Sequence, residues 1–122
     1  MKFGVQLFGP GNLCKSDPES FFKTLLDIWY QLIEPCVWLE EVPEDAKIYP
    51  IWTIDEFTTY KSIYEKYNLK VQSCHIFTRS LDKMSNNHDF NSLISIIASK
   101  IKKLHDDFGI SYFILAGHSE TT

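Results

Sequence analysis

The sequence predicts an α/β fold in which parallel strands alternate with helices. Four short runs rich in β-branched and aromatic residues begin near residues 2, 32, 69 and 110, and runs of this kind are typical of buried strands. The segments between them carry apolar residues at helical spacing, and such alternation favours parallel strands joined by right-handed crossovers. At 122 residues the chain is long enough for one core and shows no linker, so a single domain is expected.

Composition and charge narrow the classes of function. The chain has 12 Lys and Arg against 16 Asp and Glu, a net charge of −4, so it lacks the basic surface of a nucleic-acid-binding protein. Its longest apolar runs are too short for a transmembrane helix, and no membrane partner is expected. Cys14, Cys36 and Cys74 are odd in number and far apart, and the residues that lead into the first strand do not have a signal-peptide pattern, so none is expected. Free thiols in a reducing cytoplasm are therefore expected.

The first strand is predicted over residues 2–8, where apolar residues alternate, and the run GPGN at residues 9–12 ends it. A helix is predicted to begin at Asp17, because this acidic N-cap is followed by Pro18 and Glu19 in the first turn. Apolar residues then recur at helical spacing, so one face of this helix is expected to pack on the sheet.

The second strand is predicted over residues 32–36, with Pro35 near its end because proline disrupts the interior of a ladder. The connection over residues 37–52 is acidic, holds tryptophan and tyrosine, and is longer than most loops. Its Trp38 is a candidate substrate-binding residue, since an aromatic face suits the apolar C–H patches of a sugar ring. A solvated connection with a few packed aromatic residues is the alternative.

The second helix has a recognisable start and end. Thr53 and Glu56 stand at the spacing of a capping box, and Trp52 with Phe57 fits the hydrophobic staple. At the other end, Asn68 can adopt the left-handed conformation that caps a helix. These signals place the helix between the long connection and the third strand.

The third strand is predicted over residues 69–77, a run that is too short for a helix. Alternation predicts two faces, one with Val71, Ser73 and His75 and the other with Gln72, Cys74 and Ile76. His75 thus lies near the carboxyl end of its strand, where α/β folds bind ligands.

The last predicted elements are a helix from about residue 89 to residue 108, ended by Gly109, and a fourth strand over residues 110–116. No helix pattern follows this strand. Because a parallel sheet needs both faces covered, the architecture looks stopped midway.

Each predicted strand places a polar residue near its carboxyl end: Gln6, Glu34, His75 and His118. These ends share one rim in a parallel sheet, so the four residues are candidate substrate-binding groups, and His75 is the candidate catalytic residue. Each also has a structural interpretation. His75 could be hydrogen-bonded inside a core, and backbone amides could cap the carboxylate of Glu34. Gln6 could serve only to satisfy polar neighbours, and His118 could simply be solvated at the chain end.

The residues predict neither a nucleotide site nor a metal site. Gly9 and Gly11 follow a strand, but Cys14 stands where the dinucleotide fingerprint needs its third glycine, and Pro10 removes an amide donor. The cysteines and histidines do not follow CxxC or HxxxH spacing, so no metal-ligating residue is assigned.

A family resemblance is carried by three strand motifs. They are residues 2–8 (KFGVQLF), 33–36 (IEPC) and 71–77 (VQSCHIF), which resemble the first three strands of the sugar phosphate isomerase/epimerase family, the xylose isomerase-like TIM barrels. The helix that leads into NLKV is similar to the family's approach to its third strand, and the likeness runs over essentially the whole chain. Trp29 and Asn68 depart from it, because the family usually has glycine before the second and third strands.

The resemblance implies half of a (β/α)8 TIM barrel, with parallel strands in sequential order and one helix in each crossover, as one partial domain over residues 1–122. Family members bind one divalent metal (Mn, Mg or Zn) through carboxylates and a histidine on later strands, and move a proton through an enediolate intermediate. By resemblance, His75 and Glu34 would contact the hydroxyls of a sugar or sugar phosphate, with His75 as a donor or proton relay.

The implied barrel takes about 250 residues, so the resemblance corresponds to its amino-terminal half. The family's metal ligands lie on later strands, and we therefore expect neither a complete metal site nor isomerase activity from this chain alone. The first and fourth strands would be open edges, so self-association through them is expected.

Two other interpretations remain open. A barrel endonuclease that repairs abasic DNA would use histidines of the third and fourth strands for zinc, as His75 and His118 could be used. The run HIFT at residues 75–78 lacks the His-Ala-Pro-Tyr signature of those enzymes, and the acidic charge disfavours DNA. A flavodoxin-like binding module would instead be a complete small sheet with its first strand between the second and the third.

Overall fold

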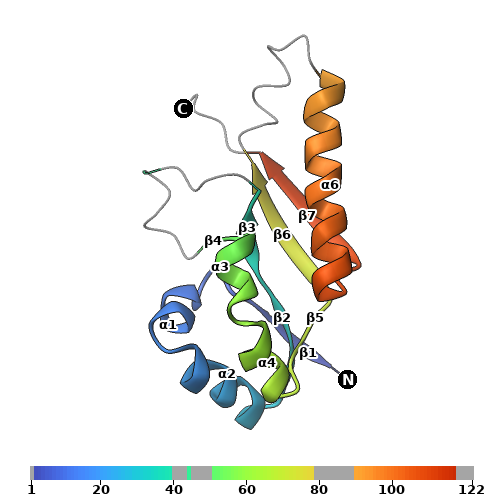
Figure 1. The fold of residues 1–122 in the computed structure, drawn as a ribbon. Coiled ribbons are helices and arrows are strands. Elements are labelled where there is room, and N and C mark those ends of the chain that lie inside the picture. Colours follow the sequence, from blue (N-terminus) through green and yellow to red (C-terminus); the bar gives the residue numbers. More distant parts are fainter. Residues whose placement is uncertain (1, 40–43, 45–50, 79–89, 118–122) are drawn as a thin grey trace.

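The protein has a mixed α/β structure with parallel strands and with helices packed against the sheet (Figure 1). The computed structural model describes residues 2–39, 44, 51–78 and 90–117. Within these residues every strand pairing is parallel, as the alternation of elements predicts. His118, one of the predicted site residues, lies outside the described residues.

The strands form two sheets that join into one surface. One sheet has the order β1 (Phe3–Gln6), β2 (Tyr30–Glu34) and β5 (Lys70–Val71). The other has the order β4 (Trp52–Thr53), β3 (Cys36–Trp38), β6 (Ser73–Thr78) and β7 (Tyr112–Gly117). Because only Pro35 separates β2 from β3 and only Gln72 separates β5 from β6, the second and third predicted strands each run through both sheets.

The four predicted strands lie side by side in sequence order, but the short strand β4 does not fit this order. It forms at the end of the predicted connection over residues 37–52, where no strand was expected, and it pairs with β3 on the side away from β6. β2 lies between β1 and β5, and β6 lies between β3 and β7, so the first, second, third and fourth predicted strands are successive neighbours. A flavodoxin-like sheet would place its first strand between the second and the third. The described strands do not have that order.

The second strand is longer than its prediction. It runs over Tyr30–Glu34 and continues in β3, so Trp38 lies in a strand and not in the long connection, and that part of the prediction is wrong. Pro35 has no N–H to donate to the ladder, which explains the break. Its carbonyl still accepts a hydrogen bond from the backbone N–H of His75, at 2.9 Å.

A shift of register divides the third strand. Ile33 pairs with Val71, and Cys36 pairs with His75. Between these two pairs the chain advances by three residues on the second strand but by four residues on the third strand. The extra residue on this strand reverses its alternation at Gln72, as a bulge does. Val71 therefore packs in the core on the helical side of the sheet, and the prediction that it shares a face with His75 is wrong.

The first crossover contains two helices, α1 (Gly11–Ser16) and α2 (Pro18–Asp27), where one was predicted. α2 begins as the sequence predicts, because the Asp17 side chain accepts a hydrogen bond from the Ser20 N–H at 3.1 Å. α1 starts within the GPGN run, which the sequence suggests is only a break. Proline and glycine are compatible with a helix at its start, so this run can begin α1.

The second crossover also contains two short helices, α3 (Ile54–Thr58) and α4 (Lys61–Lys66). The predicted capping box is confirmed by both of its hydrogen bonds, each 3.1 Å long between Thr53 and Glu56. The interruption has a local cause. The hydroxyls of Thr58 and Thr59 donate to backbone carbonyls of α3 at 2.7 Å, and such bonds compete with the helical ladder.

In the third crossover the described residues form the helix α6 (Phe90–Phe108), which packs beside β6 and β7 (Figure 1). It ends at Gly109, as predicted, and this glycine has a φ of 70°. Within the described ranges, no helix combines the length and the apolar character that a membrane span requires.

Left-handed residues precede the second and third strands. Trp29 has a φ of 75° and Asn68 a φ of 57°, and both stand at the positions where the resemblance points to glycine. Asparagine tolerates this conformation, but for most other residues it costs about 1–2 kcal/mol. Trp29 is also 81% exposed, so little packing offsets that strain.

Replacing Trp29 with glycine is expected to raise the free energy of unfolding by about 1 kcal/mol, because the left-handed strain is removed and little contact is lost. Urea denaturation followed by circular dichroism measures the change. Trp29→Ala is the matched control, because it removes the ring but keeps the Cβ that causes the strain. An equal gain in both variants would contradict the conformational explanation.

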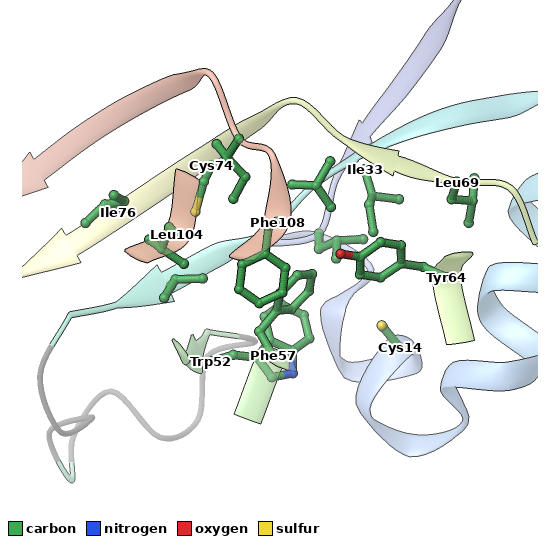
Figure 2. Close-up of a cluster of buried hydrophobic side chains, with 14 of the residues drawn as sticks. Cys14, Ile33, Trp52, Phe57, Tyr64, Leu69, Cys74, Ile76, Leu104 and Phe108 are labelled. Carbon is green, nitrogen blue, oxygen red and sulfur yellow. The ribbon is translucent and has the colours of Figure 1, made fainter. Parts of the chain in front are cut away.

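The main core lies between the sheet and the helices (Figure 2). Ile33, Cys74 and Ile76 contribute from the strands, and Phe57 and Leu104 from the helices. The Phe57 ring is fully buried, and its centroid lies within 6.0 Å of four other aromatic ring centroids, those of Trp52, Tyr60, Tyr64 and Phe108. The contact between Trp52 and Phe57 confirms the predicted staple.

The three cysteines are free and buried, as predicted for free thiols. Burial raises the pKa of Cys14 and of Cys36 to about 12, and it also raises the pKa of Cys74. A thiol is nucleophilic only as its thiolate. The folded protein is therefore expected to resist alkylation near neutral pH.

Alkaline pH is expected to destabilise the fold. Below about pH 9 the thiols are protonated in both states, so their contribution to stability is fully present. Between about pH 9 and pH 12 only the unfolded thiols ionise, and the free energy of unfolding should fall by up to about 1.4 kcal/mol per pH unit for each thiol. Urea titrations at several pH values measure this slope. Substitution of Cys14 and Cys36 by alanine should reduce the slope, and an unchanged slope would contradict the assignment.

Candidate polar site on the open face of the sheet

The sheet has a second face, opposite the helices, which we call the open face. Several polar side chains point to this face, because the residues next to them along each strand point into the core. Ile33 points into the core, so its neighbour Glu34 points to the open face. His75 also points to the open face, because Cys74 and Ile76 on either side of it point into the core. Gln6 follows Val5, which packs against the core from the first strand.

Gln6, Glu34 and His75 form a continuous chain of hydrogen bonds together with Ser73, and we call these four side chains the polar network. The Gln6 Nε2 amide donates to Glu34 Oε1 at 3.0 Å and lies 3.1 Å from His75 Nδ1. The Ser73 hydroxyl donates to the other oxygen of Glu34, at 2.5 Å. The network thus joins three neighbouring strands: β1 through Gln6, β2 through Glu34, and β6 through the other two residues.

An aromatic wall adjoins the polar network. The Phe77 ring stacks on the His75 ring, with a centroid distance of 4.9 Å and an interplanar angle of 9°. Phe77 also contacts Trp38, at 5.8 Å between centroids, and packs with Cys36 and Ile51 in a second small hydrophobic cluster. This packing covers one face of the imidazole ring.

Trp38 does not have the setting expected for it. Its place in β3 brings it to the same face as Glu34, but its side chain is only 1% exposed. The expectation that Trp38 lies on a loop is therefore wrong, whereas its role in substrate binding stays a prediction. Trp38 instead supports Phe77, which in turn supports the imidazole.

A shallow hollow of about 250 Å³ lies beside the network. The hollow is lined by Gly4, Val5, Gln6, Leu32, Ile33, Glu34, Gln72, Ser73 and Tyr112. It extends from Gln6 and Glu34 toward the amino ends of the strands. A Cβ added at Gly4 would lie 3.2 Å from the Leu32 Cβ, so glycine allows the first two strands to approach closely here.

The structure brings together three of the five predicted site residues. Gln6, Glu34 and His75 share one hydrogen-bonded network, as their positions near the strand ends suggest. Sequence reasoning did not select Ser73 as a site residue, although its place two residues before His75 puts both on one face. The signal was therefore present in the alternation.

The described side chains do not fit a metal site. No group of three or more His, Cys, Asp or Glu residues in the described part of the chain is placed to hold a metal ion. Both oxygens of Glu34 already accept hydrogen bonds, and His75 Nδ1 faces the Gln6 amide. The arrangement instead offers amide, hydroxyl, carboxylate and imidazole groups, which suit a small polar ligand rich in hydroxyls.

Comparison of the sequence with family models and with curated proteins finds no match, and comparison with solved structures finds none. The function of the network must therefore be argued from its own residues and from the strand motifs.

Proposed function

We propose that the chain is the amino-terminal half of a (β/α)8 barrel of the sugar phosphate isomerase/epimerase type, and that the polar network binds hydroxyl groups of a sugar or sugar phosphate. The observation that carries the proposal is the hydrogen-bonded chain from His75 through Gln6 and Glu34 to Ser73. Such a network on the concave side of a barrel would face the substrate.

Three features of the fold support the half-barrel. The four predicted strands are parallel and lie side by side in sequence order, with only the short β4 outside that order, and the described helices contribute to one core on the same face of the sheet. The left-handed conformation of Trp29 and Asn68 matches positions where the family usually has glycine. On the open face, β7 carries Tyr112 and Ile114, which are 70% and 49% exposed, and further strands of a barrel would cover them.

Each network residue has a role in this proposal. Glu34 accepts hydrogen bonds from substrate hydroxyls in exchange for, or in addition to, the hydroxyl of Ser73. His75 contacts a substrate oxygen and acts as the donor or proton relay for the proton transfer. The family's metal, which polarises the sugar oxygens when bound, would need ligands other than the described residues of this chain. We therefore expect binding without isomerase turnover from this chain alone.

Nuclear magnetic resonance tests the binding. Xylose, fructose and fructose 6-phosphate are titrated into ¹⁵N-labelled protein, and we expect saturable shifts at the Gln6 side-chain amide and at His75. Glu34→Gln is expected to weaken binding about tenfold or more, because hydrogen bonds to a charged group contribute about 1.5–3 kcal/mol. Glu65→Gln, a change of the same kind in the exposed α4, should leave binding unchanged.

Two outcomes would overturn the proposal. One is the absence of saturable shifts with all three sugars while the protein remains folded. The other is equal weakening by Glu34→Gln and Glu65→Gln, which would place the effect outside the network.

A further inference from the structure

We infer that Gln6 is a positioning residue that holds His75 in the tautomer with its proton on Nε2, which makes His75 a hydrogen-bond donor to its ligand and excludes it as a metal ligand. The juxtaposition that carries the inference is a single amide nitrogen placed between a carboxylate and an imidazole. The tautomer is a property of the protein alone. Only the identity of the oxygen that receives the Nε2 hydrogen bond rests on the proposed function.

The orientation of the Gln6 amide follows from Glu34. A carboxylate has acceptor oxygens only, whereas a glutamine amide has an oxygen that accepts and a nitrogen that donates two hydrogens. Glu34 also receives the Ser73 hydroxyl on its other oxygen. If the Gln6 amide were reversed, its oxygen would lie next to Glu34 Oε1 in place of the nitrogen, and two acceptor oxygens cannot hydrogen-bond to each other. The nitrogen therefore faces Glu34.

The same nitrogen determines the state of His75. One amide hydrogen points to Glu34 Oε1, at 3.0 Å, and the other can point to His75 Nδ1, at 3.1 Å. A hydrogen bond at this position needs a lone pair on Nδ1, so the proton of the neutral imidazole must be on Nε2. The Phe77 ring stacked on the imidazole disfavours a turn of the ring that would exchange its two nitrogens.

The Nε2 atom is then the group that a ligand meets. His75 is half-buried, and among the described residues no hydrogen bond to Nε2 is present. An N–H at this atom donates to a hydroxyl, carbonyl or phosphate oxygen. It does not accept a proton from the ligand while the network is intact, so of the two roles proposed for His75 this inference selects the hydrogen-bond donor.

The tautomer also bears on zinc. A metal bound at Nε2 requires the proton to be on Nδ1, where it would normally donate to a carboxylate, a carbonyl or water. Here Nδ1 faces an N–H₂ group, so metal binding at Nε2 would break the bond to Gln6 and place two donors against each other. The inference therefore argues against the zinc endonuclease interpretation through the described chemistry of His75.

A long-range ¹H–¹⁵N correlation spectrum of the ¹⁵N-labelled protein measures the tautomer. The spectrum links the two ring nitrogens of each of the four histidines to the carbon-bound ring protons, and His75→Gln assigns the signals. At a pH well above the ordinary titration range of imidazole, we expect a pyridine-type shift at Nδ1 and a pyrrole-type shift at Nε2. Signals typical of the Nδ1–H tautomer in the wild-type protein would overturn the inference, whether or not any sugar binds.

The role of Gln6 is tested with Gln6→Met, which keeps the length of the side chain but removes the donor. The share of the Nδ1–H tautomer is expected to rise roughly fivefold, the equivalent of the loss of one hydrogen bond worth about 1 kcal/mol. Gln31→Met, at an exposed position of β2, is the matched control and should leave the share unchanged. An unchanged share in Gln6→Met would show that Gln6 does not position His75.

The addition of Zn²⁺ tests whether His75 can bind a metal. We expect the His75 ring signals of the wild-type protein to stay unchanged when Zn²⁺ is added in slight excess. A Zn²⁺-dependent shift of those signals toward the Nδ1–H pattern would overturn the inference and support the zinc interpretation.

Discussion

Phe57→Ala is expected to lower the free energy of unfolding by about 3–5 kcal/mol, the range for a large aromatic side chain removed from a core. The Phe57 ring is fully buried and contacts rings from α4, α6 and β4, so no single element can move to fill the cavity. A domain of this size has a total stability of about 5–15 kcal/mol. The loss is therefore expected to remove a large share of the total stability.

Urea denaturation followed by circular dichroism measures this loss. Phe3→Ala is the matched control, because the same group is removed from a side chain that is 53% exposed on β1. The control should cost less than about 1 kcal/mol. A loss in Phe57→Ala as small as in the control would show that the aromatic cluster does not hold the helices to the sheet.

Concentration-dependent self-association is the second large effect that we expect. Among the described strands, β1 pairs only with β2 and β7 pairs only with β6, so each leaves one side of its backbone without a strand partner. β7 also exposes Ile114 and Leu115, by 49% and 45%. Unpaired edges with exposed apolar side chains are typical sites of association between chains.

Sedimentation velocity over a range of concentrations measures the association. The double substitution Ile114→Lys and Leu115→Lys is expected to weaken it by roughly 100-fold or more, since burial of two such side chains contributes about 3 kcal/mol or more. Leu13→Lys is the control, because Leu13 is 66% exposed and belongs to α1, which lies away from β7 (Figure 1). A wild-type protein that stays monomeric at high concentration would contradict the prediction.

Much of the candidate site follows from local rules. The period of two along a strand and the place of each strand in the sequence put Gln6, Glu34 and His75 near the carboxyl ends, and the parallel order brings those ends together. The same argument could have predicted Ser73, which lies two residues before His75 on the same strand. The contacts between these side chains could not be predicted, because their distances depend on the register between strands that are 28 to 69 residues apart in the sequence.

Local patterns were sufficient to predict the α/β alternation, the starts of α2 and α3 and the end of α6, because helix caps and apolar periodicity act between residues close in the chain. The face of Val71 and the burial of Trp38, in contrast, depend on tertiary contacts. The first depends on a one-residue shift against β2 and β3, and the second depends on packing against Cys36, Ile51 and Phe77. Register and packing are set by partners distant in sequence, so no local pattern specifies them.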